Sequence, residues 1–519
     1  MLIFSGCAQL PPREVEALKT QPIDTSQTRL ARTFAPAVQA HPQRSGVHLI
    51  ENGRDAFAIR VLLAEAAERT LDVQYYIWRD DVSGGLMLDA LSRAAERGVR
   101  VRLLLDDLGT SGLDEKLAAL DAHPLIEVRL FNPFPQRGAK YLGFLTDFSR
   151  LNRRMHSKSF TVDHQATVVG GRNVADAYFG ATTETLFVDL DVLAIGPVAQ
   201  KVDEAFERFW DSASAYPIAQ LRPQTTPPPA PAVSLAPLVT QMQNPDLTAE
   251  ARAYLQAVTQ STFVASLLAQ KIDLEWAPVQ LVSDEPEKVV GGESQASLLH
   301  NRMARIVGKP KSEFYLVSPY FVPTQSGYDW FAGLRKSGVK VKVLTNALES
   351  TDVTAVHAGY ARWRRPLLEA GVELYETRRA QIDTDLEKDK KPQRSQRSQG
   401  SGIGLSSGES LHAKTFAVDR QTLFVGSFNF DPRSVRLNTE IGLLIQSPHL
   451  AGMLAKTFDE QVAQQSYAPR VAPDGHIEWF DEGSGPPGQP VVFEHEPNVG
   501  FWRSLYVRFL QLLPIDSLL

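Results

Sequence analysis

Helical and strand-like patterns of apolar residues alternate along the first half of the chain. Residues 55–70 and 84–98 carry apolar side chains at helical spacing, and a short apolar run follows each, at 71–78 and 99–107. Runs of this length that are rich in Val, Ile, Leu and Tyr are typical of buried strands. The strand–helix–strand order predicts an α/β fold with a mixed, largely parallel sheet flanked by helices.

The same order of elements recurs in the second half. The strand-like runs at 71–78, 99–107 and 126–132 correspond in order to those at 314–322, 338–346 and 371–376. Recurrence on this scale indicates a duplicated lobe. We therefore expect two α/β lobes, with the active site between them.

The expected divisions of the 519-residue chain follow from this repeat and from local composition. A Pro-rich stretch at 222–237 indicates a linker, and the residues before the first lobe are polar. We expect, in order, an N-terminal tether, a first lobe, a linker with a connecting segment, a second lobe and a C-terminal tail, at 1–45, 46–221, 222–290, 291–470 and 471–519.

The single cysteine, Cys7, excludes an internal disulfide and a multi-cysteine metal site. It follows the small residues of "FSG", as in bacterial lipoproteins, but the six residues before it lack a positive and apolar leader. Two alternatives remain open. Cys7 is lipidated if the true start lies upstream, or it is an incidental thiol.

The chain ends in an aromatic, amphipathic stretch. Residues 501–513 carry Phe, Trp, Tyr and Leu at helical spacing, with Arg503 and Arg508 between them. Such a helix either docks on its own protein or lies in a membrane interface, and we favour the interface. No run of 18 apolar residues occurs, so we expect no membrane-spanning helix.

The overall charge argues against one broad class of partner. The net charge of -6 and the pI near 6.0 give no chain-wide basic footprint, so nucleic acid is not an expected partner. The basic stretch at 383–410 is either a solvated loop or a flap over an anionic substrate.

Two short segments repeat one spacing of reactive side chains. "MHSKSFTVD" and "LHAKTFAVD" each carry a histidine, a lysine two residues later and an aspartate five residues after that: His156, Lys158 and Asp163; His412, Lys414 and Asp419. Residues two apart in a strand share a face, so each imidazole lies beside an ammonium. The ammonium repels metal ions and attracts phosphate, so we expect neither a metal nor a cofactor.

Each copy is followed by a second short motif. "GGRN" (170–173) and "GSFN" (426–429) offer small residues for close backbone approach, and Asn173 and Asn429 add amide donors for phosphoryl oxygens. Two complete copies in repeated lobes are not a chance match. Facing each other, they would surround one phosphorus atom.

This paired pattern resembles the His-x-Lys-x4-Asp…Gly-Ser-x-Asn hallmark of the phospholipase D superfamily. "LDVQYYIWRDDVSG" and "LFVGSFNFDPRS" are similar to its bacterial cardiolipin synthase C branch. The likeness runs from about residue 50 to the carboxyl end, with phosphodiesterase motifs at about 150–177 and 406–433. One departure is Gly171, where the family has serine.

The resemblance implies a two-step displacement at a phosphodiester. His156 would be the nucleophile that forms a phosphatidyl-histidine, and His412 the acid/base. The sequence is symmetric and cannot assign the two histidines by itself. The lysines and asparagines would hold the phosphoryl oxygens, and the two aspartates would brace the motifs.

A carboxylate should hold the second nitrogen of each histidine. Glu440 matches the family's acidic residue after the second motif. For the first-half histidine, Asp189 matches by strand context and Glu184 matches by offset, 28 residues as between His412 and Glu440. We expect Asp189.

The resemblance implies a phosphatidyltransferase that makes cardiolipin from phosphatidylethanolamine and phosphatidylglycerol. The alternatives are a phospholipase D hydrolase that releases phosphatidic acid and, third, a phosphodiesterase or nuclease. Expected partners are the two phospholipids and the membrane surface, and the residues do not say whether a helper protein is needed. We expect a bacterial cell-membrane protein, attached peripherally or by a lipid anchor.

Overall fold

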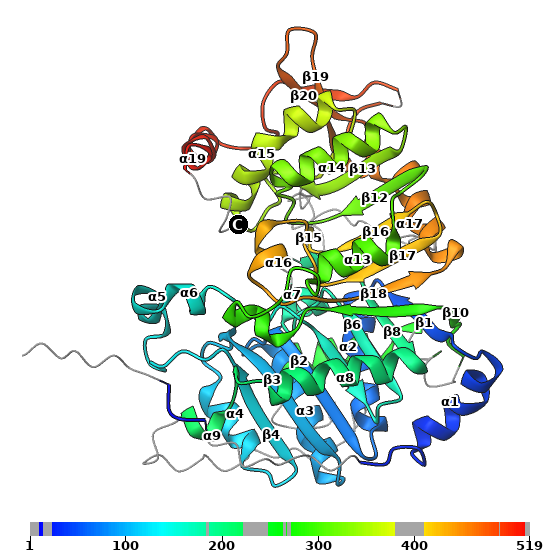
Figure 1. The fold of residues 1–519 in the computed structure, drawn as a ribbon, viewed down its shortest axis with the longest axis vertical. Helices are drawn as coiled ribbons and strands as arrows, with labels where there is room; N and C mark the ends of the chain where they lie inside the picture. The colour runs from blue at the N-terminus through cyan, green and yellow to red at the C-terminus, as the bar shows by residue number, and fades with distance from the viewer. Residues whose placement is uncertain are drawn as a thin grey trace, which may run out of the picture.

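Two sheet-containing lobes are stacked along the long axis of the molecule (Figure 1). The computed structural model describes residues 10–13, 23–182, 186–221, 248–262, 266, 271–378, 409–486 and 488–513. Cys7, Glu184, the Pro-rich stretch at 222–237 and residues 383–408 lie outside these ranges. Within them, no helix is long and apolar enough to cross a membrane.

The first lobe contains a nine-stranded sheet in the order β10-β1-β8-β6-β5-β2-β3-β4-β9. The central strands β2, β3 and β4 are parallel, and the others pair antiparallel, so the sheet is mixed as expected. Its strands are β1 (Ser45–Ile50), β2 (Thr70–Ile77), β3 (Arg100–Gly109), β4 (Ile126–Phe131), β5 (Ser159–Val162), β6 (Ala166–Gly170), β8 (Asp191–Ile195), β9 (Ala215–Pro217) and β10 (Glu275–Ala277).

Helices cover both faces of this sheet. On the outer face, α2 (Gly53–Ala66), α3 (Val82–Glu96) and α11 (Ala249–Thr259) contribute side chains to one apolar core with the strands. On the other face lies α8 (Pro197–Asp211), which begins at a proline, a residue suited to a first helical turn. The elements expected at 55–70, 71–78, 84–98 and 99–107 therefore form as predicted.

The second lobe repeats this plan with ten strands in the order β11-β18-β17-β16-β12-β13-β14-β19-β20-β21. The strands are β11 (Val279–Ser283), β12 (Glu313–Val317), β13 (Lys340–Asn346), β14 (Glu373–Thr377), β16 (Thr415–Val418), β17 (Thr422–Gly426), β18 (Ile441–Gln446), β19 (Ser466–Val471), β20 (Ile477–Asp481) and β21 (Val491–Phe493). Its helices are α13 (Leu299–Val307), α14 (Thr324–Lys336), α15 (Thr354–Glu369), α16 (Pro432–Arg436), α17 (Pro448–Glu460) and α19 (Phe501–Gln511).

The lobes are joined by a shared apolar core. Val192 and Ala194 of the first sheet belong to the same buried cluster as Leu443 and Ile445 of the second. One residue, Pro278, separates β10 in the first sheet from β11 in the second. The sheets therefore form one continuous body.

Three described segments differ from the expected divisions. Residues 29–40, within the expected tether, form α1, because Thr28 caps the helix and Leu30 is buried. In the expected connecting segment, α11 and β10 pack with the first lobe. The expected tail begins inside the second sheet, because β20 and β21 extend it antiparallel from β19.

Candidate active site

The segment that directly precedes each motif histidine pairs with a segment of the opposite lobe. Before His412, β15 (Glu409–Leu411) pairs in parallel with β7 (Leu186–Val188) of the first lobe, and the His412 amide donates to the Val188 carbonyl at 2.7 Å. Reciprocally, Met155 bridges to Thr439, and the His156 amide donates to the Thr439 carbonyl at 2.9 Å. This exchange brings the two half-sites together.

The carboxylates that hold the imidazoles are consequently crossed between the lobes. Nδ1 of His156 lies 2.8 Å from Oε2 of Glu440, and Nδ1 of His412 lies 2.5 Å from Oδ2 of Asp189. All four side chains are buried. The expectation that Asp189 holds the first-half histidine is wrong, because β7 delivers Asp189 to the strand that precedes His412.

The departure from the family motif at Gly171 follows from this geometry. A Cβ atom at Gly171 would lie 2.2 Å from Oδ1 of Asp189, so the close approach of this carboxylate leaves room only for glycine. In the second copy, Ser427 donates its hydroxyl to Oε2 of Glu440 at 2.5 Å, and Ser434 donates to Oε1 at 2.8 Å. The longer glutamate leaves room for the serine.

Both motif lysines are buried against their own histidines. Nζ of Lys158 donates to the His156 carbonyl at 2.5 Å, and Nζ of Lys414 lies 2.8 Å from Nδ1 and 3.3 Å from Nε2 of His412. Burial lowers the pKa of Lys158 to about 7 and that of Lys414 to about 8. An incoming phosphate anion would stabilise the charged ammonium groups.

The imidazoles are neutral in the free site near neutral pH. Burial, then the charges of Lys158 and Lys414 and that of His412 when it is protonated, lower the pKa of His156 well below its ordinary value. Two of these three charges come from the second lobe, as expected for a single shared site. Burial and Lys414 also lower the pKa of His412, and Asp189 opposes the decrease.

The motif aspartates serve as braces away from the imidazoles, as expected. Asp163 accepts from the backbone N–H groups of Glu68, Arg69 and Thr70 at 2.8 to 3.3 Å, just before β2. Asp419 does the same with residues 311–313 of the second lobe at 2.7 to 3.1 Å. Both adopt positive φ, 48° and 51°, in the turn after the motif strand.

The two motif asparagines are not equivalent. Asn173 accepts from the Ile77 amide at 3.2 Å and donates to the Tyr178 hydroxyl at 2.9 Å. Asn429 has a buried Oδ1 without a hydrogen-bond partner among the described residues. The side-chain amide of Asn429 is therefore held by fewer hydrogen bonds to neighbouring residues than that of Asn173.

Aromatic residues that the sequence analysis did not single out surround both imidazoles. Tyr76 packs edge-on to His156, with ring centroids 5.0 Å apart. Tyr178 and Phe187 pack against His412 at 5.1 and 5.2 Å, and the Tyr178 hydroxyl lies 3.5 Å from Nε2. In the sequence, the only indication of Tyr178 was its position five residues after the motif residue Asn173.

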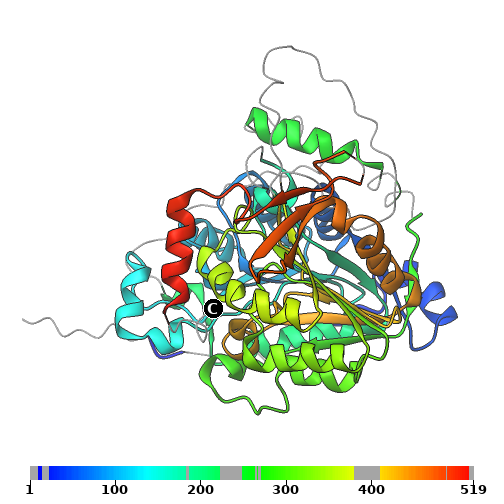
Figure 2. The same ribbon diagram turned by 90° about the horizontal axis from the view of Figure 1, so that it is seen from above.

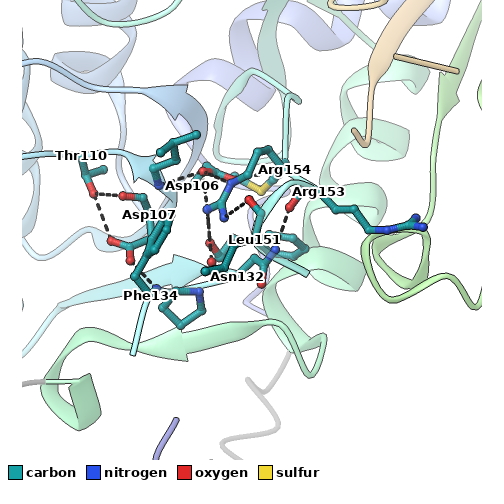
Figure 3. A network of polar contacts seen from close by, with 12 residues as sticks. Asp106, Asp107, Thr110, Asn132, Phe134, Leu151, Arg153 and Arg154 are labelled. Atoms are coloured by element: carbon teal, nitrogen blue, oxygen red, sulfur yellow. Dashed lines mark hydrogen bonds and ion pairs between the residues drawn. The ribbon is translucent and has the colours of Figure 1, made fainter. Parts of the chain in front are cut away.

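A buried polar network fixes the segment before His156 (Figure 3). Asp106, in the second half of β3, accepts from Nε of Arg154 and from the Met155 amide, both at 2.8 Å. Asn132 donates to the Arg153 carbonyl at 2.7 Å. The network holds this segment rigidly in the first lobe while Thr439 of the second lobe pairs with it.

Known proteins share both the sequence and the fold. The chain matches the family described as "Cardiolipin synthase, PLD-like domain" over residues 60–210 and 303–462. It is 46% identical to cardiolipin synthase C of Escherichia coli K12 over 95% of this chain and 100% of that protein. It is 24% identical to the major cardiolipin synthase ClsA of Bacillus subtilis 168, over 80% of this chain and 69% of that one.

A solved structure supports the two-lobed fold. The phosphatidylserine synthase of Haemophilus influenzae Rd KW20 superposes with a TM-score of 0.56, covering 93% of this chain and 99% of that chain at 15% identity. Together with the paired motifs and their crossed carboxylates, these matches identify the chain as a member of the phospholipase D-like family of cardiolipin synthases.

Proposed function

We propose that this protein transfers a phosphatidyl group from phosphatidylethanolamine to phosphatidylglycerol and so makes cardiolipin. The observation that carries the proposal is the single buried site in which two braced imidazoles and two lysines converge. The 46% identity to a protein named cardiolipin synthase C supports this choice of reaction within the superfamily.

The asymmetry of the imidazoles supports His156 as the nucleophile. Glu440 holds Nδ1 of His156, which leaves Nε2 with its lone pair, and the low pKa keeps this ring unprotonated. His412 suits the acid/base role. Although burial opposes it, Lys414 and His412 lower the pKa of Asp189, so an ionised carboxylate stabilises the imidazolium when it forms.

The reaction then proceeds in two balanced displacements. The bound diester anion raises the pKa of His412, which takes up a proton at Nε2 before the first step. Nε2 of His156 then attacks phosphorus, the bond from phosphorus to the ethanolamine oxygen breaks, and the His412 imidazolium gives that oxygen its proton. His412 next takes a proton from the terminal hydroxyl of phosphatidylglycerol, whose oxygen attacks phosphorus and releases His156. Lys158, Lys414 and Asn429 stabilise charge on the phosphoryl oxygens in both steps.

Apolar side chains exposed on one side of the molecule support a membrane surface as the partner. Phe501 and Trp502 on α19 and Leu512 directly after it are 71%, 78% and 83% exposed, while Val507 and Leu510 pack on α15. One face of α19 therefore docks on its own protein, and the other face is available for a membrane interface. An outward apolar face rimmed by Arg503 and Arg508 fits an anionic bilayer interface.

A second exposed apolar segment lies on the same side, in the first lobe. It comprises α5 (Gly143–Thr146) and α6 (Phe148–Leu151), where Leu145 and Phe148 are 83% and 50% exposed. Figures 1 and 2 show α19 and this segment at the same side of the two lobes in both views. Together they would seat both lobes on the bilayer that holds the substrates.

The test is a product analysis. Purified protein is incubated with phosphatidylethanolamine and phosphatidylglycerol in mixed micelles, and the products are resolved by mass. Cardiolipin with free ethanolamine supports the proposal, and phosphatidic acid as the sole product would assign a hydrolase instead. Cleavage of a DNA oligonucleotide with both lipids intact would overturn both lipid reactions.

A further inference from the structure

Three ligand-type side chains converge near the end of β5 that lies away from His156. Asp72 lies on β2, His164 follows Asp163 in the turn after β5, and Asp203 lies on α8. Nε2 of His164 lies 3.7 Å from Oδ2 of Asp72 and 3.6 Å from Oδ2 of Asp203. One ligand atom from each residue lies within 4.8 Å of the other two.

These contacts are too long for hydrogen bonds and leave buried polar atoms unsatisfied. Oδ2 of Asp72, Nε2 of His164 and Oδ1 of Asp203 are buried without a hydrogen-bond partner among the described residues. The Asp72 side chain is fully buried, and its unpartnered oxygen is the one aimed at His164. A buried carboxylate oxygen in this state is unusual, which points to a missing ligand.

The second lobe has a bridging arginine at the equivalent position. Arg420 follows Asp419 as His164 follows Asp163, and it bridges a strand to a helix through Glu313 at 2.5 Å and Asp459 at 2.6 Å. The guanidinium thus joins β12 to α17 with a fixed positive charge. In the first lobe, the shorter imidazole reaches neither carboxylate at hydrogen-bond distance.

The surrounding charges leave room for a cation. Arg102 bonds Oδ1 of Asp72 at 2.5 Å and pairs with Glu207 at 2.6 Å, so it does not contact Oδ2. With Arg100 nearby, two guanidinium groups face three carboxylates, those of Asp72, Asp203 and Glu207. One negative charge remains when His164 is neutral and Asp203 is ionised.

We propose that Asp72, His164 and Asp203 bind a divalent metal ion of the zinc class, which ties the β5–β6 turn to α8. A point equidistant from three atoms that are 3.6 to 4.8 Å apart lies about 2.1–2.4 Å from each, close to zinc–nitrogen and zinc–oxygen distances. His164 is 21% exposed and Asp203 13%, so water can complete the coordination. The ion is structural and takes no part in phosphatidyl transfer.

The experiment uses the full chain. The protein is treated with chelator, dialysed and supplied with zinc chloride at pH 8, where protons compete little with zinc for the imidazole of His164. Metal content and thermal unfolding are measured. We expect one equivalent of zinc and a rise in Tm that chelator reverses. His164→Ala and Asp203→Asn should each weaken zinc binding at least tenfold.

Two further variants sharpen the test. His476→Ala removes an exposed histidine that contacts Asp474 and Glu478, and it should leave the zinc content unchanged. His164→Arg reproduces the residue of the second lobe and should lose zinc binding while keeping the Tm of the zinc-loaded protein. If the unaltered protein takes up no more zinc than His164→Arg, or if zinc leaves its Tm unchanged, the proposal is wrong and His164 acts as an imidazolium bridge.

Discussion

Nδ1 of His412, in the second lobe, lies 2.5 Å from Oδ2 of Asp189, a carboxylate of the first lobe. The reciprocal pair, His156 and Glu440, crosses the lobes in the opposite direction. Neither half-site therefore contains the carboxylate that holds its own imidazole, and each lobe supplies that carboxylate to the other.

Removing the charge of either crossed carboxylate, Asp189 or Glu440, should slow the reaction while leaving the fold intact. In Asp189→Asn and Glu440→Gln, the amide no longer stabilises the imidazolium or fixes its tautomer, so kcat should fall by roughly 10²–10⁴-fold with KM changed only a few-fold. Steady-state kinetics in mixed micelles measure both constants. As a control, Asp163→Asn should lower the Tm and leave kcat near that of the unaltered protein.

His156→Ala and His412→Ala should each abolish turnover, with unchanged circular dichroism. The two variants differ on a phosphatidyl ester of p-nitrophenol, whose leaving group needs no proton. His412→Ala should accumulate one phosphatidyl group per chain, detected by intact mass, because His156 still attacks. A covalent adduct in His156→Ala instead would reverse the assignment of nucleophile and acid/base.

Gly171→Ser should reduce the unfolding free energy more than Ser427→Gly, the opposite change at the equivalent position of the second motif. The new Cβ would collide with Oδ1 of Asp189, so the carboxylate must move away from His412. We expect a loss of about 1–3 kcal/mol in unfolding free energy and a fall in kcat. Ser427→Gly removes one hydroxyl that donates to Glu440 and should cost only about 1 kcal/mol. Denaturant titration compares the two variants, and equal losses would contradict the crowding at Gly171.

Binding of an anionic diester should weaken as pH rises. The pKa of Lys158 is about 7 and that of Lys414 about 8, so both ammonium groups are lost from the free site between pH 6.5 and 9. The anion favours the protonated lysines, so at high pH its binding must take up protons. Calorimetry with dimethyl phosphate, which keeps one charge throughout, should show at least a tenfold weaker Kd at pH 9. Lys414→Arg should reduce this dependence, because arginine stays charged.

Charged residues on the exposed apolar side should detach the protein from vesicles. Trp502→Glu and Leu145→Glu each place a carboxylate where an apolar side chain is exposed, and co-sedimentation with phosphatidylglycerol vesicles should fall at least tenfold. Turnover of lipids dispersed in detergent should remain, since neither residue contacts the site. Val492→Glu, at a half-exposed position on β21, is the matched control and should bind vesicles normally.

The fold and the principal reactive residues could be predicted because they are encoded locally. Hydrophobic periodicity marks the strands and helices, and the fixed spacing around His156 and His412 does not depend on how the lobes meet. The brace roles of Asp163 and Asp419 also follow from position, since each closes a tight turn of its own motif.

Features that depend on contacts between distant segments could not be predicted. The exchange of Asp189 and Glu440 requires β7 to pair with β15, residues more than 200 positions apart. The meeting of Asp72, His164 and Asp203 likewise depends on how a strand, a turn and a helix pack. In sequence they are isolated polar residues with no shared spacing.

Because Asp189 and Glu440 each hold the histidine of the opposite lobe, the site can be completed only late in the synthesis of the chain. When β10, the last strand of the first sheet, has been made, His156 still lacks Glu440, which follows more than 160 residues later. At that point the nascent chain carries only one histidine motif, without the carboxylate that holds its imidazole. Catalysis begins only when translation has passed the last piece of the site, so an interrupted chain yields no partly active lipid-cleaving enzyme.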